Sequence, residues 1–304
     1  MEFLYLLESI RMPVLDTLML LVTRLGEETA FLVAAMILYW CVDKRKGYNL
    51  MVVGFFGTMA NQFLKLVFRV PRPWVLDPEF TILEQAREAA AGYSFPSGHS
   101  QSAVGTFGSI AASTGNGPIR WLCIAVCVLV PLSRMYIGVH TPADVLVGSA
   151  MALALVFVLR KPILRGGDGV MPWLIAGMLL AALGLLAYVE CWPFPETVDA
   201  HNLGSGVKNA YTMLGSILGL AVVYPLERKY VGFSTRAGWQ GQIVKVLGGF
   251  ALVLLVKEGL RSPLEAVFAG HMAARAVRYF LIVLTAGLLW PMTFSRLSKI
   301  GEKR

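Results

Sequence analysis

The residues whose types could do chemistry lie in three short polar clusters, at 65–73, 93–100 and 133–144, between long apolar runs. Together the clusters hold cations, histidines and a carboxylate. Such groups are costly at the edge of a membrane unless they serve a purpose.

The last cluster has the most informative spacing. Thr141-Pro142-Ala143-Asp144 predicts a helix start, because threonine suits the N-cap, proline the first helical position, and an acid three residues after the cap completes a capping box. His140 then lies just before the helix, and Asp144 one turn into it. A carboxylate on one imidazole nitrogen fixes the tautomer and leaves the other nitrogen as a nucleophile or base. The alternative is a simple cap beside an interfacial histidine.

The first cluster places Lys65 inside an apolar run and Arg72 seven residues later, about two helical turns on. We expect the two cations to share one face, and Pro71 and Pro73 to end the helix there. A buried lysine needs an anion or a nearby route to water. The alternative for Lys65 is snorkelling to the lipid headgroups, which Arg69 fits better.

The middle cluster, Pro96-Ser97-Gly98-His99, predicts a tight turn that opens a helix. Backbone N–H groups at a helix start form an anion site, and glycine lets the anion approach closely. His99, at the rim of that site, would reach a leaving oxygen. The alternative is an ordinary turn with a histidine that faces solvent.

Together the clusters supply what phosphoryl transfer through a phosphohistidine requires. Lys65, Arg72 and Arg134 can hold the phosphoryl oxygens, and the planar guanidinium of Arg134 suits a bidentate contact. One histidine can attack in line while the other protonates the leaving group. No metal-ligand set is apparent in the sequence. We therefore expect no metal and no cofactor, the cations doing the work that Mg²⁺ does elsewhere.

The combined pattern closely resembles the type 2 phosphatidic acid phosphatase family, which shares its active site with vanadium haloperoxidases. The resemblance rests on Lys65-x6-Arg72-Pro73, Pro96-Ser97-Gly98-His99 and Ser133-Arg134-x5-His140-x3-Asp144, in family order and spacing over 65–144. It implies an integral-membrane phosphoric ester hydrolase. A weaker likeness is to the glucose-6-phosphatase branch. It rests on Arg72-Pro73-Trp74-Val75-Leu76-Asp77 and on nine apolar runs with the N-terminus outside.

The same resemblance implies a role for each site residue. His140 would be the nucleophile that becomes phosphorylated, and Asp144 would orient and polarise it. His99 would protonate the leaving alkoxide and then activate water. The phosphate would be held by Lys65, Arg72, Arg134, Ser97 and Gly98.

The composition indicates the class of protein that carries this site. Of the 304 residues, 56% are hydrophobic and only 15% are charged, whereas soluble domains have more charge and shorter apolar runs. This balance is typical of a polytopic membrane protein. The net charge of +8 lies mostly beside apolar runs, where it acts as a topology signal, and this argues against a nucleic-acid partner.

The apolar runs predict an all-α fold with about nine transmembrane helices. They lie at approximately 29–42, 48–69, 99–114, 119–135, 142–159, 171–189, 209–225, 243–257 and 276–293. Basic connections alternate with segments such as 190–207, which has no Lys or Arg. The positive-inside rule then predicts a cytoplasmic C-terminus and an outer N-terminus, with 70–98, 134–141, 190–208 and 258–275 outside. Arg261 and Arg275 in the last segment are an exception to this alternation.

Three parts follow from this arrangement: an amphipathic segment at 1–28, a phosphatase core at 29–165 and additional membrane helices at 170–304. The boundary is predicted at 166–169. The amphipathic segment would lie along the membrane, with a short extra span as the alternative. The run at 99–114 is rich in small residues, so we expect it to touch protein more than lipid.

The predicted function is hydrolysis of the phosphomonoester or diphosphate of a lipid at the outer face of the cell membrane, because the site lies at the membrane edge. A sugar-phosphate substrate and a phosphotransferase reaction are alternatives within the family. A lipid or anion transporter is the alternative from another class. It would need broken helices near the midplane, whereas these motifs lie at the ends of the apolar runs. The sequence assigns neither an oligomeric state nor a role for 257–278.

Overall fold

The computed structural model describes residues 1–87, 90, 92–166 and 169–300. These residues form helices and no strand, which confirms the all-α class. The chain divides into two compact units: unit 1 comprises 1–34, 49–162 and 193–206, and unit 2 comprises 35–48, 163–192 and 207–304. The boundary predicted at 166–169 includes 167 and 168, which lie outside the described residues.

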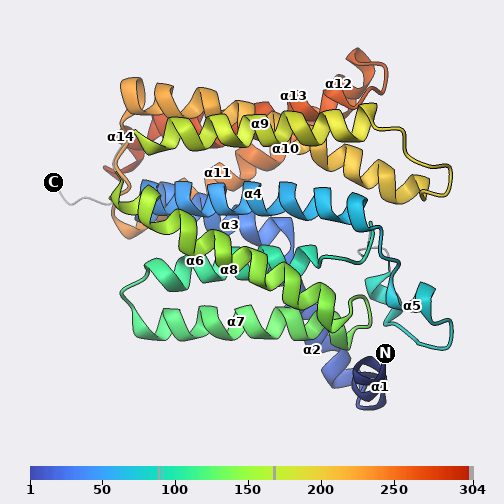
Figure 1. Ribbon diagram of the computed structural model, residues 1–304. Helices are drawn as coiled ribbons and strands as arrows, with labels where there is room; N and C mark the ends of the chain where they lie inside the picture. The colour runs from blue at the N-terminus through green and yellow to red at the C-terminus, as the bar shows by residue number, and fades with distance from the viewer. Residues whose placement is uncertain (88–89, 91, 167–168, 301–304) are drawn as a thin grey trace. The chain divides into compact units, whose positions relative to one another are not determined.

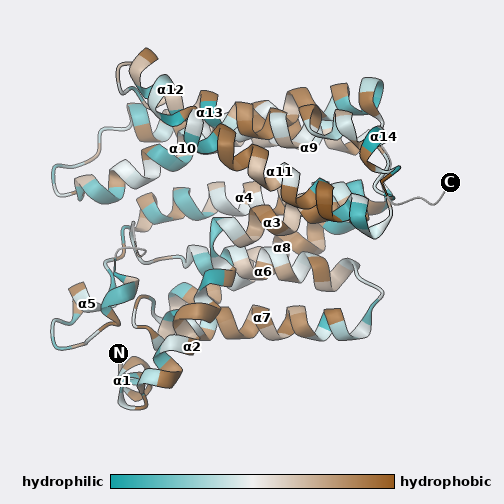
Figure 2. Ribbon diagram, turned by 180° about the vertical axis from the view of Figure 1, so that it is seen from behind, coloured by the Kyte–Doolittle hydropathy of each residue, from teal (hydrophilic) through white to brown (hydrophobic). Residues whose placement is uncertain are grey.

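Unit 1 contains all three motifs, and its helices are labelled in Figure 1. Its helices, three of which continue into unit 2, are α1 (Glu2–Ser9), α2 (Pro13–Thr23), α3 (Glu28–Ile37), α4 (Lys44–Phe68), α5 (Pro73–Leu76), α6 (Gly98–Ser113), α7 (Gly117–Tyr136) and α8 (Pro142–Arg165). Short 3-10 turns at Arg24–Gly26 and Glu84–Ala86 join some of them. The apolar faces of α2 and α6 pack against α7, which is itself hydrophobic along most of its length (Figure 2).

Among the described residues, six helical segments are long and apolar enough to cross a membrane. They are Lys44–Leu76, Gly117–Tyr136, Pro142–Arg165, Val170–Cys191, Ala200–Val231 and Ala273–Leu297. A seventh candidate is a pair bent by 53°, Pro13–Gly26 with Glu28–Val42. Length and composition thus support a polytopic membrane protein with six or seven spans, and they do not confirm the expected count of nine.

The difference from nine arises at three places. Residues 13–26, which we expected to lie along the membrane, form half of the bent pair. The runs predicted at 99–114 and 243–257 fall on α6 and α11 (Trp239–Gly259), which are not among the six candidates. With its 16 residues, α6 is about 24 Å long, against a hydrocarbon core of about 30 Å.

The small residues of α6 have the expected consequence for packing. No residue of this helix is fully exposed, and Ala103 packs with Val126 and Val130 of α7 in one core cluster. An added Cβ at Gly105 would already be in van der Waals contact with the Val53 side chain, at 3.4 Å. Close backbone approach of this kind is what small residues permit in a helix bundle. The prediction that this run contacts protein is therefore confirmed.

Unit 2 holds the remaining helices and an aromatic core. The helices are α9 (Val170–Cys191), α10 (Ala200–Leu226, whose first turns belong to unit 1), α11, α12 (Arg261–Val267), α13 (Ala273–Leu284) and α14 (Phe294–Leu297), with π-helical or 3-10 turns at Leu38–Val42, Glu227–Val231, Thr285–Leu289 and Pro291–Thr293. Trp40 and Trp290 both pack edge-on against Phe294. Lys44 pairs with the buried Glu227 at 2.5 Å, which satisfies a carboxylate that burial would otherwise destabilise.

Candidate active site

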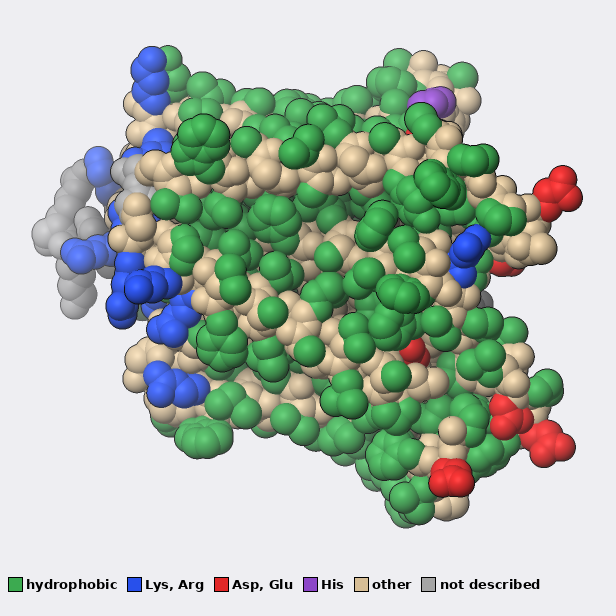
Figure 3. All heavy atoms as spheres, viewed as in Figure 1, with side chains coloured by type: hydrophobic (Ala, Val, Ile, Leu, Met, Phe, Trp, Pro, Cys, Tyr) green, Lys and Arg blue, Asp and Glu red, His purple; other side chains and the backbone are tan. Residues whose placement is uncertain are grey.

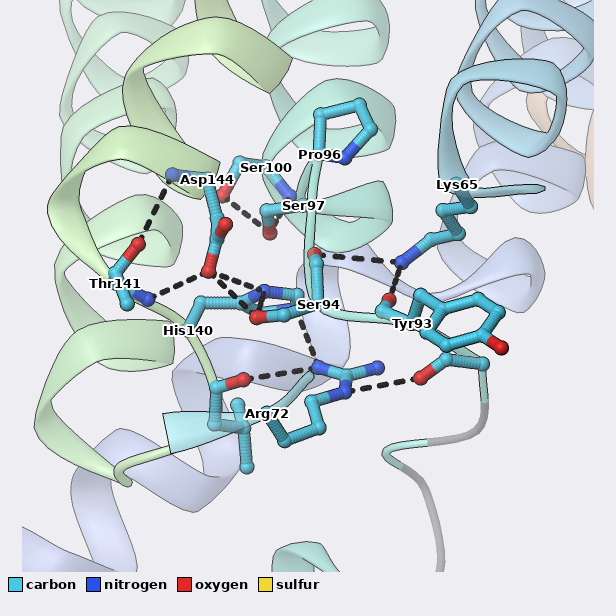
Figure 4. A network of polar contacts seen from close by, with 12 residues as sticks. Lys65, Arg72, Tyr93, Ser94, Pro96, Ser97, Ser100, His140, Thr141 and Asp144 are labelled. Atoms are coloured by element: carbon cyan, nitrogen blue, oxygen red, sulfur yellow. Dashed lines mark hydrogen bonds and ion pairs between the residues drawn. The ribbon is translucent and has the colours of Figure 1, made fainter. Parts of the chain in front are cut away.

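His140 lies immediately before α8 and is almost fully buried. Figure 4 shows its ring between the Arg72 guanidinium on one side and the Asp144 carboxylate on the other. The Arg72 Nη1 atom is 2.9 Å from Nε2 of His140. On the opposite edge of the ring, Nδ1 is 3.5 Å from Asp144 Oδ2 and 3.4 Å from Ser94 Oγ. Each ring nitrogen therefore has a different kind of neighbour.

These neighbours determine the tautomer of His140. A guanidinium can only donate hydrogen bonds, so Nε2 of His140 must accept the bond from Arg72 and carry no proton. The proton of the neutral ring then lies on Nδ1, which faces a carboxylate and a hydroxyl. We assign this tautomer from the bonding partners. It leaves a lone pair on Nε2, as a nucleophile requires.

Asp144 is held rigidly by the start of α8. Its Oδ2 atom accepts from the Thr141 backbone N–H at 2.7 Å, and the Thr141 hydroxyl accepts from the Asp144 backbone N–H at 3.3 Å. This reciprocal pair is the capping box that the sequence predicted. The cap therefore does two things at once: it begins the helix and fixes the carboxylate beside His140.

Ser94 is a member of this network that the sequence analysis did not single out. Its hydroxyl donates to Asp144 Oδ2 at 2.6 Å and lies 3.4 Å from Nδ1 of His140. The side chain is fully buried. Ser94 stands within the 93–100 cluster, but nothing in the spacing distinguishes it from any other serine in a turn. Only the folded loop shows that it lies between the carboxylate and the imidazole.

Lys65 and Arg72 both bind the loop that carries Ser94. Lys65 Nζ donates to the carbonyl of Tyr93 and lies 3.5 Å from that of Ser94. Arg72 Nε donates to the Gly92 carbonyl at 3.1 Å, and its Nη1 to the Val139 carbonyl at 2.9 Å. Both side chains are buried. The two cations therefore bring the first motif against the other two.

The expectation that Lys65 and Arg72 share a helix face is wrong. Helix α4 ends at Phe68, and Arg69 leaves it with φ of 50°, in the left-handed region. Arg72 is instead the N-cap of α5, whose first residue is Pro73. The helix therefore ends at the left-handed Arg69, before it reaches either proline, rather than after Arg72. The two cations meet at one loop from different elements.

Arg134 comes to the site from the last turn of α7 and is 1% exposed. Its Nη1 atom donates to Thr23 Oγ1 of α2 at 2.8 Å. Its Nε and Nη2 atoms are buried without a partner among the described residues. A buried guanidinium with two unused donors is costly unless an anion completes its bonding. This arrangement fits the bidentate contact expected of Arg134.

Ser97, Gly98 and His99 form the start of α6. Ser97 is the N-cap, with Oγ 3.4 Å from the Ser100 N–H, and its own N–H donates to the Asp144 carbonyl at 2.9 Å. Gly98 is the first residue of the helix and His99 follows, partly buried. The imidazole of His99 makes no hydrogen bond within the described part of the chain. The predicted turn and helix start are therefore present, and they lie against the start of α8.

Asn61 is a second residue that the sequence analysis missed. It is fully buried on α4, one turn before Lys65, and its Nδ2 atom donates to the Pro96 carbonyl at 3.2 Å. Its Oδ1 atom has no partner among the residues described. An added Cβ at Gly98 would lie 3.5 Å from that oxygen. Asn61 therefore holds the Pro96–Gly98 turn from the side of α4.

Burial and the surrounding positive charges both act on the protonation of His140. Burial lowers the pKa of His140 well below its usual value of 6.5, and the charges of Arg72, Arg134, Lys65 and His99 lower it further. The imidazole is therefore neutral at neutral pH. The structure thus brings the three motifs together around one histidine, in a positive field suited to a phosphate group.

No cluster of three or more His, Cys, Asp or Glu side chains that could hold a metal ion is found in the described ranges. The polar groups at this site are three cations, two imidazoles, hydroxyls and one carboxylate. The cations and hydroxyls suit the oxygens of an anion.

Two segments of the chain match models of known protein families. Residues 46–164 match the model of the PAP2 superfamily, and residues 211–303 match the model described as PAP2 superfamily phosphatase, transmembrane extension. The first match contains every residue of the site. No solved structure matches the chain.

Curated relatives agree with this assignment. The chain is 31% identical over 147 residues to undecaprenyl-diphosphatase BcrC of Bacillus subtilis (strain 168), a match that covers 48% of this chain and 73% of that protein. It is 30% identical over 169 residues to phosphatidylglycerophosphatase B of the same organism, covering 50% and 76%. A probable sphingosine-1-phosphate phosphatase of Dictyostelium discoideum is 31% identical over 160 residues, but this match covers only 38% of that longer protein.

The apolar helices and the matched transmembrane extension make this chain an integral membrane protein. The chain belongs to the PAP2 superfamily and is a phosphatase of that family, a phosphoric ester hydrolase.

Proposed function

We propose that the chain hydrolyses the phosphomonoester or diphosphate of a lipid through a phosphohistidine on His140. The observation that carries the proposal is the opposed bonding of the His140 ring. Nε2 accepts from Arg72 at 2.9 Å, and Nδ1 faces Asp144 at 3.5 Å. The lone pair of Nε2 therefore points at a cation that binds phosphate oxygens. A phosphate that Arg72 binds would place its phosphorus within reach of the nucleophile.

In the first step, Nε2 of His140 attacks phosphorus and the bond to the leaving oxygen breaks. His99, protonated, gives its proton to that oxygen, so the alcohol or phosphate leaves neutralised. Lys65, Arg72 and Arg134 balance the charge on the phosphoryl oxygens. Asp144 stabilises the positive ring, which keeps the Nδ1 proton while Nε2 carries the phosphoryl group.

In the second step, water replaces the histidine on phosphorus. Neutral His99 takes a proton from the attacking water, the bond between phosphorus and Nε2 breaks, and inorganic phosphate leaves. His140 returns to the neutral tautomer and His99 to its protonated form. No atom or electron is left over, and the cycle needs only water.

A lipid is the substrate class that the comparisons favour. The relatives named undecaprenyl-diphosphatase and phosphatidylglycerophosphatase B bear the names of lipid substrates. The site also lies at the end of three candidate spans, because Lys65, Arg134 and Asp144 belong to the segments Lys44–Leu76, Gly117–Tyr136 and Pro142–Arg165. A phosphate at that level can remain attached to chains that stay in the bilayer.

We place the site on the non-cytoplasmic face, with the N-terminus outside, the C-terminus cytoplasmic and nine spans. Within unit 1, acidic side chains gather at the end that carries α1 and α5, and basic side chains gather at the opposite end (Figure 3). Arg72, at the start of α5, is at the acidic end. The positive-inside rule supports an outer position for that end. The division into 1–28, 29–165 and 170–304 is part of the same proposal.

The experiment is release of inorganic phosphate from a lipid phosphate by the purified full-length protein. His140→Ala should lose at least about a thousandfold in kcat, because the nucleophile is gone. His201→Ala is the matched control, since this histidine is exposed and outside the site. Substrate labelled with ³²P should also leave label on the wild-type chain after an alkaline quench, where a phosphohistidine survives. Full activity of His140→Ala, or label on that variant, would refute the mechanism.

Competition decides between substrate classes. A lipid phosphate should inhibit turnover of a chromogenic phosphate ester at concentrations where glucose 6-phosphate does not. The reverse order would favour a sugar-phosphate substrate while leaving the phosphohistidine intact. A phosphorylated acceptor in place of free phosphate would identify a phosphotransferase.

A further inference from the structure

A second cationic pocket is formed by residues of unit 2 alone, whereas every residue of the proposed active site belongs to unit 1. It has a volume of about 360 Å³ and is formed where α12 meets the start of α13, with one residue from α10. Its charged and polar lining comprises Lys208, Arg261, Glu265, His271, Arg275 and Arg278. Four of these side chains are cations and one is an acid.

The charges in this pocket do not cancel one another. The acid, Glu265, bonds to Arg261 at 3.4 Å, and both side chains are exposed, 55% and 61% respectively. Arg275 donates to the neutral hydroxyl of Thr212 at 2.6 Å. No acidic side chain within the described residues forms an ion pair with Lys208, Arg275 or Arg278. A net positive pocket therefore remains after internal pairing.

Arg278 is the residue that points most strongly to a ligand. It is only 8% exposed and lines the pocket, and its Nε atom has no hydrogen-bond partner in the described part of the chain. Its guanidinium lies 5.8 Å from the Tyr279 ring, a contact that supports the cation without satisfying the Nε donor. A buried donor without a partner carries a desolvation cost that an oxyanion in the pocket would remove.

The loop at 270–272, which lines the pocket, presents one further hydrogen-bond donor. Nδ1 of His271 accepts from the Ala273 N–H at 3.1 Å, so the ring proton lies on Nε2, which is then a donor. An edge contact with Tyr211 at 5.9 Å orients the ring. The start of α13 adds positive potential from its dipole. Its first N–H groups already bond to the loop, so the side chains must supply the contacts.

Membrane topology does not explain these cations. The exception to the alternation of basic segments was Arg261 and Arg275, in the segment predicted to lie outside. Basic residues there oppose the positive-inside rule rather than serve it. Because topology does not account for these basic residues, we infer that they bind an anionic ligand.

We propose that this pocket is a second oxyanion site that binds a phosphate group, free or on a lipid headgroup, through Arg278, Arg275 and Lys208. Guanidinium groups suit the oxygens of phosphate, and the volume suits a small ligand. The site lies within the matched transmembrane extension except for Lys208, which precedes it.

The test is binding of ³²P-labelled inorganic phosphate to the purified full-length protein at low ionic strength, by equilibrium dialysis. Arg278→Gln should bind about one phosphate per chain fewer than Arg236→Gln, a control that removes the same charge from an exposed position of unit 2. The double variant Lys208→Gln, Arg261→Gln changes exposed residues only, so it keeps the fold. It should weaken this binding at least about tenfold.

Equal binding by the double variant and the Arg236→Gln control would overturn the proposal, even if Arg278→Gln fails to fold. The comparison does not depend on the phosphohistidine, because both chains keep the same active site. Competition then identifies the source of the phosphate. Displacement by dihexanoyl phosphatidic acid but not by glycerol phosphate indicates a lipid headgroup, and equal displacement by both indicates recognition of the phosphate alone.

Discussion

At the scale of single residues, the site depends on how Asp144 reaches His140. The carboxylate is 3.5 Å from Nδ1, a long contact, whereas Ser94 donates to the same carboxylate oxygen at 2.6 Å and lies 3.4 Å from Nδ1. The hydroxyl therefore acts as a bridge between the two. We infer that Ser94 holds the His140 and Asp144 side chains in position and does not itself contact the phosphate.

Ser94→Ala tests this bridge. Loss of a hydrogen bond to a charged group is worth about 1.5–3 kcal/mol, so kcat should fall roughly tenfold to a hundredfold while KM changes little. Ser109→Ala is the control, because this buried hydroxyl has no partner within the described residues. An unchanged kcat, or a loss confined to KM, would show that Ser94 only shapes the loop. Steady-state kinetics on both variants measure the difference.

The acid limit of activity tests the electrostatics of His140. Burial and the nearby cations, Arg72 first, lower the pKa of this histidine below 6.5. The nucleophile must be neutral, so the wild-type kcat/KM should persist as the pH falls through 6.5 and decline only at lower pH. Arg72→Gln removes the nearest positive charge, so the pKa of His140 rises and the acid limb should move to higher pH.

The pH profiles of kcat/KM for the wild type and the variant are measured with the same substrate, so that ionisation of the substrate affects both profiles equally. Arg120→Gln, at an exposed position outside the site, should leave the acid limb in place. A limb that stays fixed or moves to lower pH in Arg72→Gln would contradict the assigned neutral tautomer.

The residues that could be predicted from the sequence are those whose role follows from local spacing. The Thr141 and Asp144 capping box is local, and it formed as expected. Ser94 and Asn61 act across 50 and 35 residues, and no local pattern marks such contacts. Arg72 was assigned to the correct cluster but to the wrong element, because the left-handed Arg69 ended the helix earlier than the prolines implied.

At the scale of elements, the site requires α8 to approach the Ser97 turn closely. An added Cβ at Gly148 would lie 2.6 Å from the Ser97 carbonyl oxygen, a backbone atom that cannot easily move. The same contact region includes the Ser97 N–H bond to the Asp144 carbonyl at 2.9 Å. Gly148 therefore sets the distance between the helix that carries Asp144 and the helix that carries His99.

Gly148→Ala should separate these two helices. Overpacking of this kind costs about 1–3 kcal/mol, and the displaced turn should lower kcat as well. Gly184→Ala is the matched control, since an added Cβ in the middle of α9 meets nothing within 4 Å. The control should be neutral or more stable by up to about 1 kcal/mol. The measurements are the rate of thermal inactivation in detergent and kcat for each variant. Equal values for Gly148→Ala and Gly184→Ala would show that Gly148 does not set the distance between the helices.

The helices themselves were easier to predict than their role as spans. Apolar periodicity and caps located most of them, including α6 and α8. The count of nine spans is not confirmed at α6, whose 16 residues are fewer than the roughly 20 of a typical transmembrane helix. It is not confirmed at 13–42 either, where two helical segments bent by 53° form one candidate span. Apolar character alone does not reveal whether a helix faces lipid or protein.

At the scale of the whole molecule, the proposed orientation can be tested with a residue that the chain already has. Cys191 ends α9 and is exposed, whereas Cys123 is buried. The segment 192–207, which follows Cys191, holds Glu196 and Asp199 and no Lys or Arg, so the positive-inside rule predicts that it lies outside. A membrane-impermeant maleimide should therefore label the chain in intact cells. Cys191→Ser should abolish that labelling.

The complementary probe is Ser234→Cys in the Cys191→Ser background. Ser234 is exposed in unit 2, between the basic residues at 228–229 and 236 that the rule assigns to the cytoplasm. This cysteine should react only after the cells are permeabilised. If Ser234→Cys reacts in intact cells and Cys191 does not, the orientation in the membrane is the reverse of the one proposed. The phosphatase would then face the cytoplasm, because Cys191 and the site belong to segments placed on the same side by the same rule.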